Sequence, residues 1–104
     1  GATHPSGRFG ARMVWDPGLG RLVLFGGIAY TGSFPISGLS DTWTWNGTAW
    51  KVASPAHVPA ARTDAAMTWD PGAGAIVMYG GLSQITDAFF GGPALQDTRE
   101  YATP

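Results

Sequence analysis

Short apolar segments alternate with clusters of glycine, proline, aspartate and asparagine along the chain of 104 residues. In the segment 21–25, the run Leu-Val-Leu-Phe that follows Arg21 is apolar on both faces of an extended strand, as in strands buried between two layers. Segments this short, bounded by turn residues, predict β-strands and not helices. The pattern therefore indicates an all-β fold.

Four strands are predicted in the first half of the chain. Residues 16–20, Asp-Pro-Gly-Leu-Gly, supply a turn after the first strand, with proline where φ is about −65° and glycine where φ is positive. Gly26 and Gly27 end the second strand, and Asn46-Gly47 is a strong hairpin signal. The predicted strands span 9–15, 21–25, 41–45 and 49–53.

The chain repeats itself at an offset of 54 residues. The sequence Trp-Asp-Pro-Gly occupies both 15–18 and 69–72, and Arg8 falls on Arg62. Two more residues of offset bring 41–42 onto 97–98, so the loop before these residues tolerates a change of length. A period of about 50 residues is typical of the blades of a β-propeller.

The second repeat predicts strands at 63–69, 75–79 and 98–101, after which no fourth strand is expected. The chain thus divides into repeat 1, residues 1–58, and repeat 2, residues 59–104, which is incomplete.

The repeated residues resemble the kelch family. Its pattern has an arginine before the first strand, an aromatic residue at the end of that strand, a double glycine after the second, and spaced aromatic residues in the third and fourth. The matching residues are Arg8, Trp15, Gly26, Gly27, Trp45 and Trp50 in the first repeat and Arg62, Trp69, Gly80, Gly81 and Tyr101 in the second. The string from Asp41 to Trp50 resembles the secreted bacterial subtype that is grouped with galactose-oxidase-like propellers.

The resemblance implies two four-stranded antiparallel blades, the second without its fourth strand. Kelch propellers close with about four to eight blades, and two blades cannot close a ring. Three alternatives stay open. The chain is part of a longer propeller, one protomer of a ring, or a subunit that adds repeat to repeat in a filament.

Composition and charge narrow the range of partners. Six basic and seven acidic residues give a net charge of −1 without a basic run, which argues against nucleic acid. The apolar segments are too short for a membrane span. Cysteine is absent, so no disulfide, thiolate metal site or copper–radical site of the galactose oxidase type is expected. A single lysine and many threonines, serines and glycines favour an extracellular protein.

The charged and polar candidates point away from catalysis. The resemblance implies that Arg8 and Arg62 face a ligand pocket, where a guanidinium binds carboxylates, while the alternative is a structural pair with Asp41 or Asp97. Asp16 and its counterpart in the second repeat are expected to accept backbone hydrogen bonds in their turns. His4 and His57 have no further ligands at metal-binding spacing. We therefore expect no enzyme activity, no metal and no cofactor.

The two long loops, 28–40 and 82–96, carry aromatic residues. Loops usually lie on the protein surface, so apolar aromatic side chains in them indicate either a binding site or local packing. We assign Tyr30, Phe34, Phe89 and Phe90 to a ligand site together with Arg8 and Arg62. The alternative is that the loops fold over a blade and bury these rings. Most of the five tryptophans are interpreted as core and inter-blade packing, because they lie at strand positions that recur between the repeats.

Two functions stay open on this sequence. The first is a non-catalytic module that recognises a protein or glycan through its loop face. The second is a structural protein whose blades from several copies associate.

Overall fold

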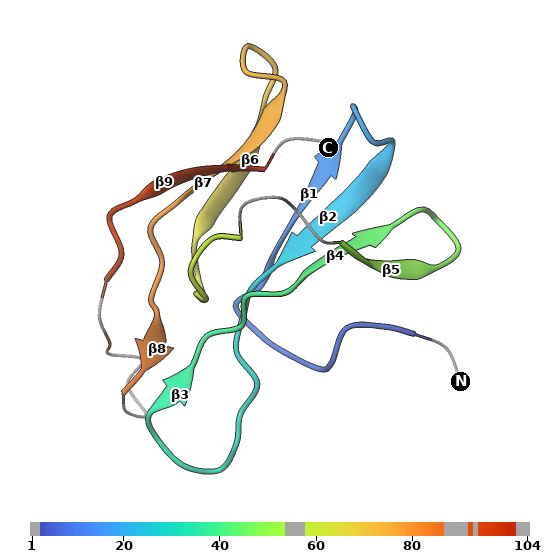
Figure 1. Ribbon diagram of the computed structural model, residues 1–104. Helices are drawn as coiled ribbons and strands as arrows, with labels where there is room; N and C mark the ends of the chain where they lie inside the picture. Colours follow the sequence, from blue (N-terminus) through green and yellow to red (C-terminus); the bar gives the residue numbers. More distant parts are fainter. Residues whose placement is uncertain (1–2, 54–57, 87–91, 93, 102–104) are drawn as a thin grey trace.

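The chain forms an all-β structure of antiparallel sheets, as the sequence predicts (Figure 1). The computed structural model describes residues 3–53, 58–86, 92 and 94–101. No helix long and apolar enough to cross a membrane is found in that part of the chain. The strands are β1 (Arg12–Asp16), β2 (Arg21–Phe25), β3 (Ile36–Ser37), β4 (Thr42–Trp45), β5 (Trp50–Ala53), β6 (Ala66–Asp70), β7 (Ala75–Tyr79), β8 (Gln84–Ile85) and β9 (Thr98–Tyr101).

The described strands make two main sheets and one small one. The first sheet has the order β1-β2-β4-β5 and the second has the order β6-β7-β9. Equivalent residues of the two repeats pair in the same register, since Trp15 lies opposite Leu22 and Trp69 lies opposite Ile76. The repeat seen in the sequence is therefore a repeat of strand pairing as well.

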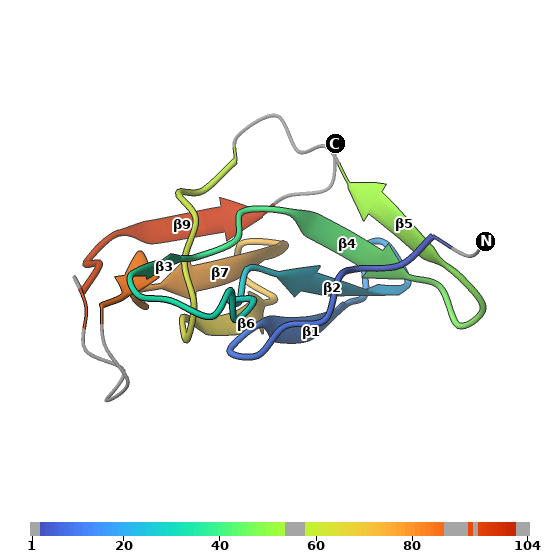
Figure 2. The same ribbon diagram turned by 90° about the horizontal axis from the view of Figure 1, so that it is seen from below.

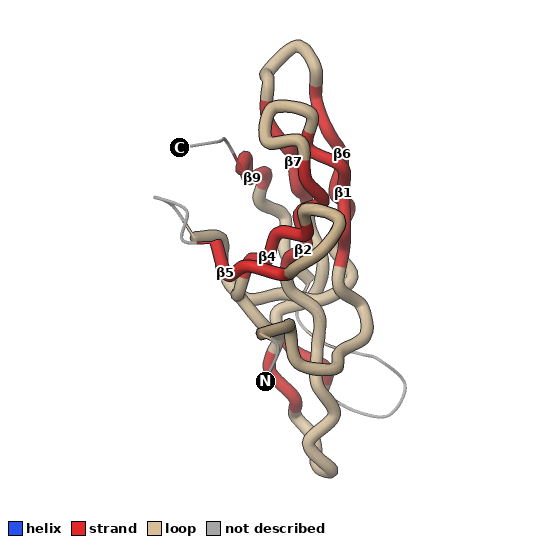
Figure 3. The backbone as a smooth tube through the Cα atoms, turned by 90° about the vertical axis from the view of Figure 1, so that its right-hand side faces the viewer, coloured by secondary structure: helices blue, strands red, loops and turns tan. Residues whose placement is uncertain are grey.

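The two main sheets pack face to face around the principal core. Figure 2 shows β1 and β6 along one edge of this pair and β5 and β9 along the other, and Figure 3 shows β1 beside β6. Phe25 of the first sheet packs with Ala65 and Met78, and Met67 covers this cluster. Burial of these side chains holds one repeat against the other.

Both first strands begin later than the sequence predicts. Gly10 and its counterpart Asp64 have positive φ values of 74° and 61°, which break the extended backbone. The N–H of Asp64 donates to the carbonyl of Gly10, so the two breaks lie against each other. Phe9 and Thr63 still form isolated bridges, but the continuous strands start at Arg12 and Ala66.

The hairpin after β4 is also longer by one residue than predicted, because Asn46 Oδ1 accepts the N–H groups of both Thr48 and Ala49. The fourth strand therefore begins at Trp50. The predictions of 21–25, 75–79 and 98–101 are confirmed residue for residue.

The two long loops pair with each other, which the sequence did not predict. β3 from the first loop and β8 from the second form a two-stranded ribbon, with Ile36 opposite Ile85 (Figure 1). Ile28, Ile36 and Ile85 form a second buried cluster, each with an exposed fraction of 4% or less. The prediction of plain loops at 28–40 and 82–96 is therefore wrong at the ribbon, which we call the β3–β8 ribbon.

Candidate functional site

Arg8 forms a two-pronged ion pair with Asp41. Its Nη1 and Nη2 atoms lie 2.6 and 2.9 Å from the two carboxylate oxygens. Nη1 also donates to the carbonyl of Gly26, and Nε and Nη2 donate to the carbonyl and hydroxyl of Ser6. All five N–H groups of the guanidinium are thus engaged within the chain.

Arg62 repeats this arrangement in the second sheet. Nη1 and Nη2 each lie 2.7 Å from an oxygen of Asp97, and Nη1 also donates to the carbonyl of Gly80. The Arg62 side chain is 1% exposed. The pairing with Asp41 and Asp97 is the structural alternative derived from the sequence, and it leaves neither guanidinium open to a ligand carboxylate.

The arginines keep both carboxyl groups ionised. The hydrogen bond from Arg8 lowers the pKa of Asp41, burial opposes this shift, and a hydrogen bond of 2.7 Å from Trp43 Nε1 lowers the pKa further. Hydrogen bonds from Arg62 and then Arg99 hold the pKa of Asp97 well below its ordinary value. Carboxylates in this state do not serve as general acids at neutral pH.

Asp16 and Asp70 serve the turns, as predicted. Asp16 Oδ1 accepts the N–H groups of Gly18 and Leu19 at 2.9 and 3.2 Å. Asp70 Oδ1 accepts that of Gly72 at 2.9 Å. Each carboxylate therefore closes the turn that joins the first two strands of its sheet.

A metal centre is not found in the part of the chain that the structure describes. No three His, Asp or Glu side chains gather there at metal-binding distance. His4 is exposed, and its Nδ1 lies 2.7 Å from the carbonyl of Pro5. His57 lies outside the described residues.

Tyr30 and Phe34 form an exposed aromatic pair on the first long loop. Their ring centroids are 5.8 Å apart with an interplanar angle of 30°, and the residues are 60% and 41% exposed. The loop that carries them is fixed on both sides, because Ile28 and Ile36 are buried. Phe89 and Phe90, the other aromatic candidates, lie outside the described residues.

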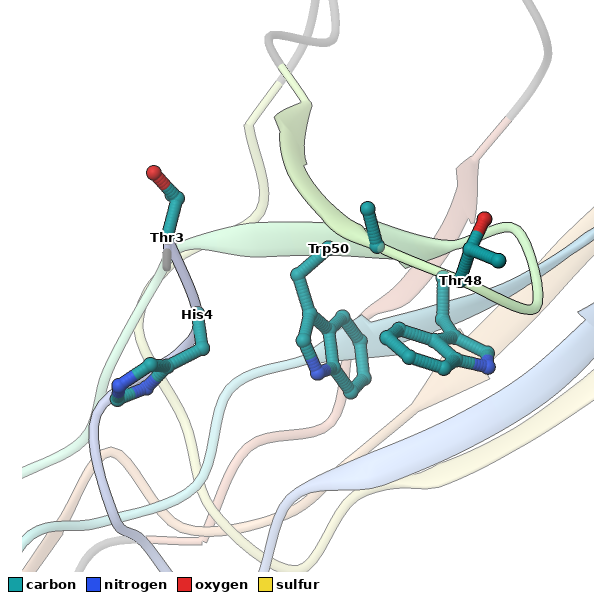
Figure 4. Close-up of a pocket in the computed structure, with 6 residues that line it drawn as sticks. Thr3, His4, Thr48 and Trp50 are labelled. Atoms are coloured by element: carbon teal, nitrogen blue, oxygen red, sulfur yellow. The ribbon is translucent and has the colours of Figure 1, made fainter. Parts of the chain in front are cut away.

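A second aromatic feature is an open pocket beside the β4–β5 hairpin (Figure 4). Trp45 and Trp50 face each other across the strand pair, with ring centroids 5.3 Å apart at 49°. The pocket has a volume of about 510 Å³, and its other lining residues are Thr3, His4, Thr48 and Ala49. Sequence reasoning missed this pocket because it assigned the tryptophans to packing.

The tryptophans of the first sheet differ in their burial. Trp43 is 9% exposed and fits the expected packing role, whereas Trp15 is 54% exposed. Trp45 and Trp50 are half-buried. One face of the first sheet therefore exposes indole surface.

Neither a scan of the chain against protein-family models nor a search of curated proteins gives a match.

Proposed function

We propose that the chain is a pair of kelch-type propeller blades that acts as a non-catalytic recognition module. It binds a protein or glycan at the loop end of the sheets, with Tyr30 and Phe34 as the contact residues. The observation that carries this proposal is the exposed, stacked aromatic pair on a loop with buried ends.

The sheet pairing supports the kelch assignment. The first sheet has four antiparallel strands in chain order, and the second repeats the first three of them in equivalent register. The arginine of each kelch pattern binds the aspartate at the start of the third strand and the carbonyl of the double glycine. These contacts give the kelch residues a common structural role in both repeats.

The anchoring of the loop favours binding. A rigid ring gives a large contact area while little conformational entropy is lost on association. The β3–β8 ribbon and the buried Ile28 fix the segment that presents Tyr30 and Phe34 before a ligand arrives. A preorganised loop lowers the entropic cost of binding.

The aromatic pair suits two classes of ligand. An aromatic face packs against the apolar C–H surface of a sugar ring and equally against an apolar side chain of a protein. A hydroxyl on Tyr30 adds a hydrogen-bonding group at the same place. The known chemistry of the pair therefore favours glycans and protein segments over phosphate-rich ligands.

Arrays of immobilised glycans and of peptides, probed with the labelled chain, test the proposal. We expect binding to one array, and we expect the double variant Tyr30→Ser/Phe34→Ser to lose it by at least about tenfold, since aromatic anchors dominate such contacts. Thermal unfolding of this variant should match that of the original chain, because both rings are exposed.

Tyr79→Ser provides the matched control. Tyr79 is 51% exposed and lies on β7, away from the loop that carries the aromatic pair. This variant should bind the array like the original chain when both are applied at a concentration where each is a monomer. Full binding by the double variant, or no binding of the original chain to either array, would contradict the proposal.

A further inference from the structure

The first sheet has one face that is apolar throughout, which we call the open face. Strand register places its residues side by side in two rows across β1, β2, β4 and β5. The rows are Met13, Leu24, Trp43 and Val52, and Trp15, Leu22, Trp45 and Trp50. Met13, Trp15 and Val52 are 52%, 54% and 49% exposed, whereas Trp43 is 9% exposed. Thr3 and His4 line the pocket at the Trp45–Trp50 end of this face. A contiguous apolar face of this kind marks an interaction surface.

The opposite face of the first sheet, which we call the covered face, packs against the second sheet. Val23 and Phe25 lie on it and are 1% and 5% exposed, because the second sheet packs there. A small cavity of about 10 Å³ lies at this junction, lined by residues of both sheets such as Phe25 and Met78. The structure thus contains one well-packed contact between a first-sheet face and a second-sheet face.

The open face carries the same residue types as the second-sheet face that makes this contact. At the repeat offset, Met13 corresponds to Met67, Trp15 to Trp69, Leu22 to Ile76 and Leu24 to Met78. Met67, Ile76 and Met78 line the junction against the first sheet. The open face therefore resembles the second-sheet face that packs on the covered face. A surface similar to the covered face could bind it in the same way.

Such a surface exists on the far side of the second sheet, and we call it the far face. Its residues correspond to those of the covered face as follows: Thr68 to Val14, Asp70 to Asp16, Val77 to Val23, Tyr79 to Phe25, Thr98 to Thr42 and Glu100 to Thr44. Tyr79 is 51% exposed, and Thr68 and Thr98 are exposed as well. The far face is an uncovered counterpart of the covered face.

We propose that the chain binds a second copy of itself head to tail, with the open face of one copy on the far face of the next. The docking repeats the junction between the two sheets within one chain. Two copies bound in this way still expose one open face and one far face. Further copies can therefore add at either end until a ring closes or a filament forms. A closed ring of about four to eight sheets would hold about two to four copies.

The contact between copies should be weaker than the junction within the chain. At the internal junction Arg12 Nε donates to the carbonyl of Ala65 at 2.6 Å, across the two sheets. The counterpart of Arg12 is Ala66, which has no such group. The open face has no charged residue in its two rows, so it offers no partner to Asp70 and Glu100 of the far face, and their desolvation weakens the contact further. We therefore expect reversible association that depends on concentration.

Light scattering coupled to size exclusion, over a range of chain concentrations, tests the association. We expect the original chain to pass from the monomer mass to a multiple of it. Trp15→Glu places a charge on the open face and Tyr79→Glu places one on the far face. Each should raise the concentration for half-association by at least about 100-fold, because burial of an unpaired charge is unfavourable.

Mixing the two variants tests the head-to-tail geometry itself. The Trp15→Glu chain keeps its far face, and the Tyr79→Glu chain keeps its open face, so an equimolar mixture should form a dimer that grows no further. A contact between identical faces would give no such rescue. Tyr30→Glu, at the loop end, should associate like the original chain, which separates this inference from the proposed ligand site.

Folding of the variants is checked by urea unfolding, and Met13→Glu serves as a second open-face variant because Met13 is 52% exposed. A monomer at every concentration would overturn the inference, and so would a multimer that both charged variants leave intact. Failure of the mixture to form a dimer would also overturn it. A monomer that takes up a soluble oligosaccharide in the Trp45–Trp50 pocket would show a glycan as the occupant instead of a second copy.

Discussion

The substitution Arg62→Ala removes a side chain that binds several acceptors at once. The guanidinium binds both oxygens of Asp97 and the carbonyls of Gly80 and Ala60. Arg62 is 1% exposed, so water does not replace the lost donors readily. We expect a large loss of stability with the fold otherwise unchanged.

The magnitude follows from the environment of each partner. Removing one member of a buried ion pair costs about 3–5 kcal/mol. The Asp97 side chain is 30% exposed, so water recovers part of its solvation and favours the lower end, about 3 kcal/mol. A domain of this size has a free energy of unfolding of about 5–15 kcal/mol. The variant therefore loses a substantial fraction of its stability.

Urea unfolding followed by tryptophan fluorescence measures this loss as a lower midpoint at unchanged slope. Arg99→Ala is the matched control, because Arg99 Nε also binds Asp97, at 2.9 Å, but its side chain is 53% exposed. Exposed pairs contribute at most about 1 kcal/mol. Equal midpoints for Arg62→Ala and Arg99→Ala would refute the reasoning that burial makes Arg62 the stronger partner.

Three further predictions follow from contacts described above. The pKa values of Asp41 and Asp97 are lower in the folded chain than the unfolded value of about 3.9, so both ion pairs contribute their full stability above that pH. This contribution is lost as the pH falls below about 3.9. The urea midpoint should therefore decline at acidic pH, and it should decline less steeply in Asp97→Asn. Ile85→Ala should cost about 2–5 kcal/mol and reduce the protection of the Ile36 amide against hydrogen exchange, since Ile85 is 1% exposed. Unchanged protection would contradict the role given to the ribbon. Gly81→Ala should lower the melting temperature, because Gly81 has a φ of 93° and a Cβ there would lie 2.7 Å from the Thr63 carbonyl oxygen. A melting temperature equal to that of the original chain would contradict this.

Local signals predicted most of the strands and turns. β2 and β7 are short apolar runs between turn residues, and their bounds agree with the prediction. The Asp16 turn was also predictable, because the aspartate accepts hydrogen bonds only two and three residues away. The pairing of Arg8 with Asp41 was among the predicted alternatives because both residues recur in the second repeat.

Contacts between distant segments could not be predicted in the same way. The β3–β8 ribbon joins residues 36–37 to 84–85, and neither segment alone has a strand pattern. The same loop holds the buried Ile36 and the exposed Phe34, two residues apart. Their difference depends on the partner strand and not on composition. The break at Asp64 is likewise set by its contact with Gly10.

The backbone of Arg62 lies between two residues of the first repeat. Its N–H donates to the carbonyl of Leu39, and its carbonyl accepts the N–H of Gly27. A segment that ends at residue 58 would leave both Leu39 and Gly27 without these bonds. The sequence repeat, residues 1–58, is therefore not a self-contained structural unit, because its backbone hydrogen bonds extend to residue 62. The backbone of residue 62 thus belongs with the first repeat, while its side chain binds Asp97 and Gly80 of the second. A chimera that exchanges repeats with another protein would therefore need an arginine at position 62 on one side of the crossover and an aspartate at position 97 on the other.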